Sequence, residues 1–369
     1  VDVFVHGTTL ATNALIERRG AKTALLTTAG MRDSIEMAHE NRFEQYDLAM
    51  VRPDPLVPRN RRIDIPERIS ATGAVLLELD EETLAAEIST LRDDGVESVA
   101  VGFLHSYVDA SHEIRTRDLI EQLWPEAPVT LSSEVCPEIR EYERFSTACA
   151  NAYLQPLISE YLQDLETRRR YLGMQCPMLL MQSGGGLGTL EDALRFPVRL
   201  IESGPAGGAL LSAELARAFQ IEKALSFDMG GTTAKLCIIN EGHPRTSREF
   251  EVGREYRFLA GSGIPLRLPV IEMVEIGAGG SSIARLDELG RIAIGPLSAG
   301  SEPGPACYGR GGTAPTVTDA DVALGRIIPD RFAGGDLTFT KEAALAAIQA
   351  SLVTDTGFDL ETASLGIAE

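Results

Sequence analysis

The first 200 residues alternate short apolar runs with longer segments in which apolar residues recur at helical spacing. The apolar, β-branched runs are 22–28, 96–104, 129–132 and 178–181, and the segments with helical spacing are 11–19, 81–93 and 112–124. Short apolar runs favour buried strands, whereas apolar residues three and four positions apart favour helices. This alternation predicts an α/β fold whose sheet is largely parallel.

Two longer segments interrupt the alternation. Residues 41–62 are polar, rich in arginine and interrupted by proline, which predicts a long surface loop, and loops of this length are usually functional. Residues 137–172 have helical spacing throughout. Pro156 predicts a break in that helix, because proline has no N–H and clashes with the preceding turn.

From about residue 196 onward, clusters of glycine separate the predicted elements. The predicted helices are 204–219 and 341–352, and the predicted strands are 224–228, 234–239, 271–276 and 283–294, the last bending as a hairpin about 287–290. The chain contains 35 glycines. Glycine lets a backbone approach a ligand closely, so these clusters suggest loops that hold phosphate or nucleotide.

The charge balance excludes a nucleic-acid-binding module. The 369 residues carry 54 acidic and 34 basic side chains, a net charge of −20, and the longest basic run is Arg168–Arg170. Apolar stretches are too short for a membrane helix, and the chain opens with VDVFVHGTT, which does not resemble a signal peptide. We therefore expect a cytoplasmic protein without a membrane or nucleic-acid partner.

The five cysteines, at 136, 149, 176, 237 and 307, are widely spaced and form no C-x-x-C pair. This spacing argues against a disulfide framework or a zinc site and predicts core thiols. Cys307 differs from the others because it lies in the glycine- and proline-rich segment 303–312. An exposed, reactive thiol is the alternative for this residue.

The segment 227–235, FDMGGTTAK, carries the clearest chemical signal. An aspartate at the end of a strand that we expect to be buried precedes two glycines and two threonines, which places a carboxylate, N–H groups and hydroxyls around one point. Phosphate needs such donors, and Mg²⁺ needs the carboxylate. Neither the P-loop pattern nor a complete dinucleotide fingerprint occurs. An ordinary hairpin turn is the alternative.

Several motifs occur together in a fixed order. They are HGTTLATNALIERRGAKTALLTTAG (6–30), Arg32–Asp33, HENR (39–42), ESGPAGG (202–208), FDMGGTTAK, PVIEMVEIGAGGSSIA (269–284) and PGPACYGRGGTAPTVTDADVALGR (303–326). Together they resemble the family of hydantoinase A, 5-oxoprolinase and the acetone or acetophenone carboxylase subunits. The resemblance spans nearly the whole chain and implies a two-lobed, actin-like ATPase fold that uses ATP and Mg²⁺.

The resemblance also implies a domain division and some departures. The first lobe is expected at 1–195 and the second at 196–369. Family members normally begin with a further phosphate loop of the form D-x-G-G-T and continue further at the C-terminus, so we expect the first lobe to be incomplete at its start and the second truncated at its end. Ser281 replaces a frequent third glycine, and Asp321 a frequent asparagine.

The resemblance assigns the nucleotide site to the glycine clusters. Asp228 is expected to act on Mg²⁺ or the γ-phosphate, and Asp319 to be a second metal or ribose contact or else a helix cap. The residues expected to contact the nucleotide are Gly230, Gly231, Thr232, Thr233, Lys235, Gly277, Gly279, Gly280, Ser281, Ser203 and Gly204. Three of these groups have a structural alternative. Lys235 could be a solvent-exposed strand lysine, and Gly277, Gly279, Gly280 and Ser281 could be plain turn residues. Ser203 and Gly204 could simply begin a helix, with Ser203 as its N-cap.

The substrate side is expected in the first lobe, from His6, Thr8, Thr9, Asn13, Asn41 and Arg42. His6 precedes a Gly-Thr-Thr helix start, a suitable place for a general base or an oxyanion contact, with a structural histidine as the alternative. Arg42 is expected to bind a carboxylate or phosphate, with a surface salt bridge as the alternative.

The resemblance implies ATP-dependent hydrolysis of a cyclic amide such as a hydantoin or 5-oxoproline, through phosphorylation of the amide oxygen. A partner subunit resembling hydantoinase B is expected, in a hetero-oligomer. One alternative is a subunit of an ATP-dependent ketone carboxylase, which phosphorylates an enolate. A further alternative is a non-catalytic, nucleotide-dependent scaffold.

Overall fold

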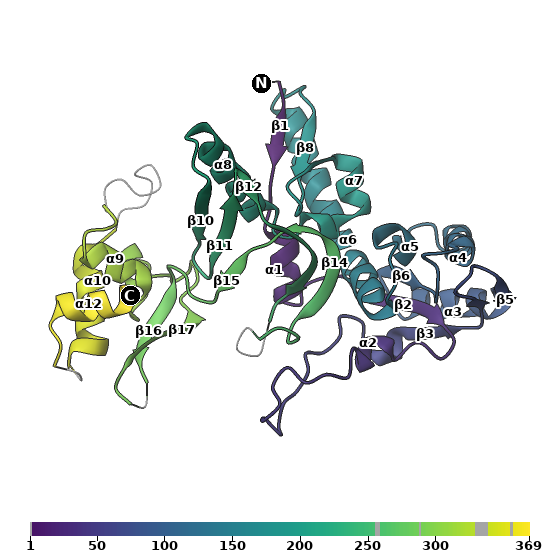
Figure 1. Ribbon diagram of the computed structural model, residues 1–369, viewed down its shortest axis with the longest axis horizontal. Coiled ribbons are helices and arrows are strands. Elements are labelled where there is room, and N and C mark those ends of the chain that lie inside the picture. The colour runs from purple at the N-terminus through teal and green to yellow at the C-terminus, as the bar shows by residue number, and fades with distance from the viewer. Residues whose placement is uncertain (1, 255–258, 288, 329–338, 355–356) are drawn as a thin grey trace. The chain divides into compact units, whose positions relative to one another are not determined.

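The computed structural model describes residues 2–254, 259–287, 289–328, 339–354 and 357–369 (Figure 1). The chain forms two compact units. The first unit comprises 1–214 and 243–272, and the second unit comprises 215–242 and 273–369. The lobe boundary predicted after residue 195 falls inside the first unit, and the lobes themselves stay a prediction.

Most of the regular structure lies in the first unit. Its strands are β1 (Phe4–His6), β2 (Thr23–Thr28), β3 (Arg62–Ile65), β4 (Arg68–Ile69), β5 (Val75–Leu77), β6 (Ser98–Gly102), β7 (Val129–Leu131), β8 (Met178–Met181), β9 (Leu187–Thr189), β12 (His243–Pro244), β13 (Thr246–Val252) and β14 (Ile264–Ile271). Its helices are α1 (Leu10–Ile16), α2 (Ser34–Met37), η1 (Arg59–Arg61), α3 (Glu81–Asp93), α4 (Ser111–Leu123), α5 (Ser132–Val135), α6 (Glu141–Tyr171), α7 (Leu190–Arg195), η2 (Pro197–Leu200) and the start of α8 (Ser203–Ala218).

A parallel sheet with strand order β3-β2-β6-β7 forms the centre of the first unit. Strand alternation sends its side chains to two cores. Leu25 and Ala100 pack with residues of α6, whereas Leu26 and Val101 pack with residues of α3 and α4 such as Ile88. The parallel α/β fold predicted from the sequence is confirmed, because both faces of the sheet are covered by helices.

The long helix α6 runs unbroken through Pro156, so the predicted break is wrong. Proline inside a helix costs about 3 kcal/mol. Residues 144–154 of α6 are buried without interruption, and Ile158 and Leu162 extend the same core beyond the proline. Packing on both sides of Pro156 therefore outweighs the lost hydrogen bond.

Between α2 and η1 the chain has no helix or strand, as the pattern of residues 41–62 predicts, and only Arg62 itself joins the sheet. The sequence pattern did not reveal the antiparallel pair β13–β14. It also merged two strands, because Ile271 ends β14 in the first unit while residues 274–276 form β15 in the second.

The second unit contains two sheets and a small helical core. Its elements are β10 (Lys223–Met229), β11 (Ala234–Asn240), β15 (Val274–Ile276), β16 (Ser282–Leu286), β17 (Ile292–Ser298), η3 (Ala306–Tyr308), α9 (Val317–Ala323), α10 (Lys341–Ile348), η5 (Gln349–Val353) and α12 (Leu360–Ala368). Strands β10 and β11 form the predicted antiparallel hairpin, and β15 pairs with β11. The hairpin predicted about 287–290 joins β16 and β17.

In the second unit, the expected burial of the strand before Asp228 is wrong and the expected burial of the cysteines is confirmed. Strand β10 is not buried, since Leu225 and Phe227 are each 59% exposed. Cys307 is buried rather than exposed, and burial raises the pKa of its thiol, so the structure does not support a reactive role. No helix among the described residues is both long and apolar enough to cross a membrane.

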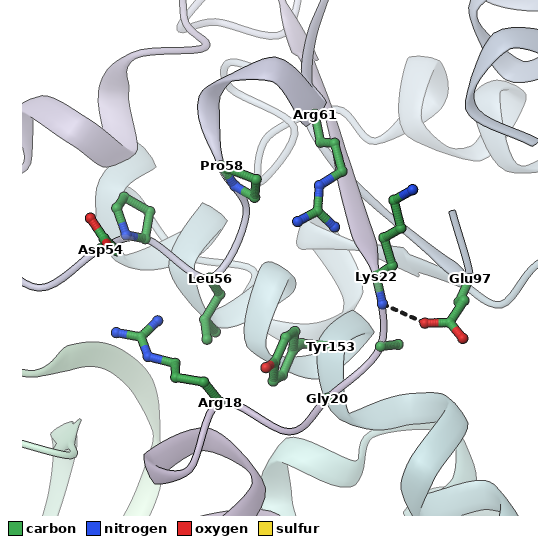
Figure 2. A pocket seen from close by; sticks show the side chains of 11 residues that line it. Arg18, Gly20, Lys22, Asp54, Leu56, Pro58, Arg61, Glu97 and Tyr153 are labelled. Carbon is green, nitrogen blue, oxygen red and sulfur yellow. Dashed lines mark hydrogen bonds between the residues drawn. The ribbon is translucent and has the colours of Figure 1, made fainter. Parts of the chain in front are cut away.

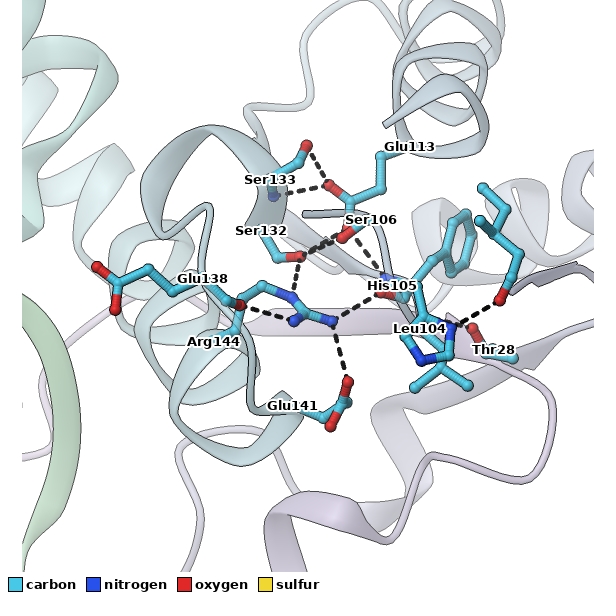
Figure 3. A network of polar contacts seen from close by, with 12 residues as sticks. Thr28, Leu104, His105, Ser106, Glu113, Ser132, Ser133, Glu138, Glu141 and Arg144 are labelled. Carbon is cyan, nitrogen blue, oxygen red and sulfur yellow. Dashed lines mark hydrogen bonds and ion pairs between the residues drawn. The ribbon is translucent and has the colours of Figure 1, made fainter. Parts of the chain in front are cut away.

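A buried polar network ties α4, α5 and α6 of the first unit together (Figure 3). The Glu113 carboxylate accepts hydrogen bonds from the Phe103 N–H at 3.0 Å, the Ser132 hydroxyl at 2.6 Å, and the N–H and hydroxyl of Ser133 at 2.9 and 2.7 Å. The Arg144 guanidinium donates to Ser132 Oγ and to the carbonyls of Phe103 and Glu138. Both charged side chains are fully buried, and burial lowers the pKa of Arg144.

We expect Arg144→Ala to lower the free energy of unfolding of the first unit by about 3–5 kcal/mol, because it leaves the buried Glu113 carboxylate without a compensating positive charge. Urea denaturation followed through the fluorescence of Trp124 measures this, since it is the only tryptophan and lies in the core beside α4. The control is Arg168→Ala, whose side chain is 74% exposed and should change the value by less than about 0.5 kcal/mol. Equal unfolding curves for the two variants would contradict the role of Arg144.

Candidate active site

In the second unit, the two glycine segments expected to hold the nucleotide lie directly against each other. The Gly280 N–H donates to the Gly230 carbonyl at 2.9 Å, and the Ser281 N–H donates to the Gly231 carbonyl at 2.7 Å. The N-terminus of α9 joins them, because the Thr318 N–H and hydroxyl both donate to the Gly280 carbonyl at 2.8 Å. The structure thus brings the hairpin loop 230–233 and the loop 277–281 into one cradle.

Glycine is required where these loops meet. A Cβ atom at Gly279 would lie 2.6 Å from the Gly231 oxygen, and one at Gly280 would lie 2.7 Å from Thr318 Oγ1. Both distances are shorter than van der Waals contact allows, so any side chain would push the loops apart. Gly277 follows β15 at the entrance to the same loop.

The tip of the hairpin keeps free hydrogen-bonding groups. The N–H groups of Gly231 and Thr232 have no partner among the described residues, and both residues are exposed. Asp228 is likewise exposed at the end of β10, and its carboxylate forms no hydrogen bond or ion pair with the described part of the chain. Lys235 lies opposite Asp228 on β11 and is half-buried. These groups fit a phosphate and a divalent cation.

Asp319 holds the start of α9 and the neighbouring backbone in place. It is fully buried, and its oxygens accept hydrogen bonds from the N–H groups of Ala306, Cys307 and Thr316 at 3.1, 2.7 and 2.9 Å and from the Thr316 hydroxyl at 2.8 Å. Thr316 is the N-cap of α9, and Asp319 completes its capping box. The capping alternative therefore accounts for Asp319. Across the described ranges, no three His, Cys, Asp or Glu side chains gather as a metal cluster.

In the first unit, the Gly-Thr-Thr segment after β1 meets the start of α8. The Thr8 N–H donates to Ser203 Oγ at 3.0 Å, and the Ser203 hydroxyl donates back to the Thr8 carbonyl at 2.9 Å. A Cβ at Gly7 would lie 3.6 Å from Gly204, and Thr9 lies beside Gly204 as well. Ser203 and Gly204, expected on the nucleotide side, thus pack against residues expected on the substrate side.

His6 lies at the end of β1, and its Nε2 atom is 2.8 Å from the Tyr161 hydroxyl. Burial lowers the pKa of His6, so the imidazole is neutral at pH 7. Its Nδ1 atom has no hydrogen-bond partner within the described ranges. A neutral imidazole oriented by a tyrosine, next to a helix N-terminus that favours anions, is suited to accept a proton.

The remaining predicted substrate residues are not gathered at His6. Asn13 is exposed on α1, one turn after Thr9. Arg42 donates to carbonyls of its own loop, those of Glu44 and Asp47, and Arg52 holds the Asn41 carbonyl in the same way. Figure 1 shows this loop extending from α2 away from β1. The structure therefore assigns neither the predicted anion contact nor the surface salt bridge to Arg42.

The sequence pattern gave no indication of Tyr161, which contacts His6 across 155 positions of sequence. Tyr161 lies in α6, where an aromatic residue at helical spacing looks like an ordinary core residue. It also missed Thr12, whose hydroxyl accepts from the Glu202 N–H at 3.0 Å and fixes the turn before α8. A pattern based on neighbouring residues carries no signal for such contacts.

Comparison with known proteins places the chain in a family. Residues 144–369 match the family described as hydantoinase/oxoprolinase, and residues 1–124 match its N-terminal region. The caprolactamase subunit alpha of Pseudomonas jessenii is 37% identical over 99% of this chain and 52% of its own length. The acetophenone carboxylase gamma subunit of Aromatoleum aromaticum is 32% identical over 99% of this chain and 50% of its own length. The chain thus spans about half the length of these relatives.

Two solved structures have the same fold as this chain. A nucleotide-free structure of acetone carboxylase matches with a TM-score of 0.80 at 26% identity, over 98% of this chain and 51% of the other. The ATP-dependent caprolactamase from Pseudomonas jessenii matches with a TM-score of 0.78 at 36% identity, over 99% and 52%. These matches confirm the predicted actin-like ATPase-type fold. Together with the family match over residues 144–369, they show that the chain belongs to the hydantoinase/oxoprolinase family.

Proposed function

We propose that the protein containing this chain hydrolyses a cyclic amide at the expense of ATP. The observation that carries the proposal is the cradle of the second unit, in which two glycine loops pack together and leave Asp228 and the N–H groups of Gly231 and Thr232 free. The likeness to a caprolactamase subunit over 99% of the chain supports the choice of an amide. Hydantoins, 5-oxoproline and lactams are the candidate substrates.

Residues of the second unit bind the nucleotide and the cation, and His6 of the first unit transfers a proton. The free N–H groups of Gly231 and Thr232 bind phosphate oxygens, and the Asp228 carboxylate holds Mg²⁺ with its waters. When bound, ATP supplies the phosphoryl group that activates the amide oxygen. In the first unit, His6 takes a proton from the attacking water on Nδ1, while the hydrogen bond to Tyr161 orients the ring.

We also propose a partner subunit that resembles hydantoinase B, in a hetero-oligomer. The relatives named above are called subunit alpha and gamma subunit, which supports an assembly of several chains. A cytoplasmic location stays a prediction from the sequence.

A ketone carboxylase subunit is the second candidate, favoured by the match to acetone carboxylase. The two activities differ in their need for bicarbonate. The test is to purify the full-length protein with its partner and measure ATP consumption with hydantoin, 5-oxoproline, caprolactam and acetophenone, each with and without bicarbonate. Stimulation by a cyclic amide without bicarbonate supports the proposal. Stimulation by acetophenone only with bicarbonate supports the carboxylase, and no stimulation by any compound supports the scaffold.

We expect Asp228→Asn to lower kcat for substrate-stimulated ATP consumption on the order of 100-fold, because the side chain loses the negative charge that holds the cation. Since Asp228 is exposed, the fold should be unaffected. Glu222→Gln is the matched control, an exposed carboxylate just before the opposite end of β10. An Asp228→Asn enzyme as active as this control would contradict the assignment.

We expect His6→Gln to lower kcat about 100-fold through loss of the general base. Because burial lowers the pKa of His6 below its usual 6.5, the wild-type rate should be flat above about pH 6.5 and fall only at lower pH, as the imidazole gains a proton. The kcat–pH profile measures this, and His243→Gln, which changes an exposed histidine, is the control. A profile that His6→Gln leaves unchanged would exclude His6 as the base.

A further inference from the structure

A cavity of about 600 Å³ opens in the first unit, away from the residues discussed above (Figure 2). Its walls come from the end of α1, from the loop before η1 and from Tyr153 of α6. This volume is typical of sites for small molecules. Neither the glycine cradle nor His6 contributes to it.

Tyr153 forms an aromatic wall of the cavity. A Cβ atom at Gly20 would lie 2.1 Å from the Tyr153 ring, so only glycine lets the chain pass this close to it. Tyr153 is 7% exposed, and its hydroxyl has no hydrogen-bond partner in the described part of the chain. Figure 2 shows the hydroxyl on the side of Leu56 and Arg18. With Leu56 and Pro58, the ring offers an apolar surface that ends in one free polar group.

Arg61 directs a guanidinium group into this cavity (Figure 2). The residue is half-buried, and its one hydrogen bond to a described residue is long, 3.4 Å from Nη1 to the Thr23 carbonyl. No carboxylate within the described ranges pairs with it. By contrast, Arg59 on the same turn binds both oxygens of Asp33, at 2.8 and 3.0 Å. The unpaired fork of Arg61 suits the carboxylate of a ligand.

The other charges limit what that ligand can be. Arg18 and Lys22 also line the cavity, but so do Asp54 and Glu97, which leaves one net positive charge. Glu97 accepts a hydrogen bond from the Lys22 N–H at 2.6 Å, whereas Asp54 has no partner among the described residues. The unpaired Asp54 carboxylate can pair with an ammonium group, so the cavity suits a ligand that carries both a carboxylate and an ammonium group.

We propose that this cavity binds an ω-amino acid, with the carboxylate on Arg61, the methylene chain along Tyr153 and Leu56, and the ammonium group near Asp54. The inference rests on the proposed function, because water that opens a lactam breaks the C–N bond, adds OH to the carbonyl carbon and leaves a carboxylate and an ammonium group. The cavity is then a site that senses the product, separate from the reacting groups.

Titration calorimetry on the full-length protein, without ATP or Mg²⁺, tests the proposal with 6-aminohexanoate, hexanoate and hexylamine. We expect 6-aminohexanoate to bind most tightly and Arg61→Met to raise its Kd about tenfold or more, the factor for one lost charge-assisted hydrogen bond. Arg59→Met is the matched control and should leave the Kd unchanged, because Arg59 is engaged by Asp33. An unchanged Kd in Arg61→Met, or hexylamine binding as tightly as 6-aminohexanoate, overturns the proposal.

Two further variants separate the possible failures. Asp54→Asn keeps the size of an exposed side chain and removes the charge assigned to the ammonium group, so it should fold and weaken binding severalfold; an unchanged Kd there would count against the site even if Arg61→Met does not fold. Asp228→Asn should lower turnover on the order of 100-fold, as above, and leave the Kd unchanged. Binding in the cavity without amide-stimulated ATP consumption refutes the proposed function alone, and stimulation without such binding refutes only this inference.

Discussion

The first unit depends on the burial of two opposite charges that never touch directly. Glu113 and Arg144 are joined through Ser132 and through the backbone of Phe103, and together they fix the ends of β6 and β7 against α4, α5 and α6. Two charges taken out of water are costly unless each is surrounded by partners. Because the partners come from several different elements, the network is complete only when these elements are in their native positions.

That constraint reaches the candidate active site through α6. The same helix that buries Arg144 carries Tyr153, which lines the cavity with Arg61, and Tyr161, which contacts His6. Its 31 residues remain one helix despite Pro156. A continuous helix gives these three side chains a fixed spacing along one axis, so the position of the imidazole follows from the packing of the core.

In the second unit, backbone contacts take the place of side-chain charges. The cradle is held by N–H to carbonyl hydrogen bonds between two glycine loops and by the N-terminus of α9, which Asp319 and Thr316 cap. Removing side chains from the contact leaves the tip of the hairpin exposed, with donors that have no internal partner. An overall charge of −20 does not oppose anion binding there, because the groups that bind are local N–H dipoles.

The sequence by itself determined the elements whose signals are local. Apolar spacing located α3, α4, α8 and three strands of the parallel sheet, β2, β6 and β7, and ordered motifs identified the family, because both depend on neighbouring residues. Only the tertiary structure decided that Pro156 does not break α6, that β10 is exposed, that Cys307 is buried and that Asp319 is a cap. It also decided that Tyr161 reaches His6 while Arg42 does not. Each of these outcomes depends on which distant residues surround a side chain, and that information is absent from local patterns.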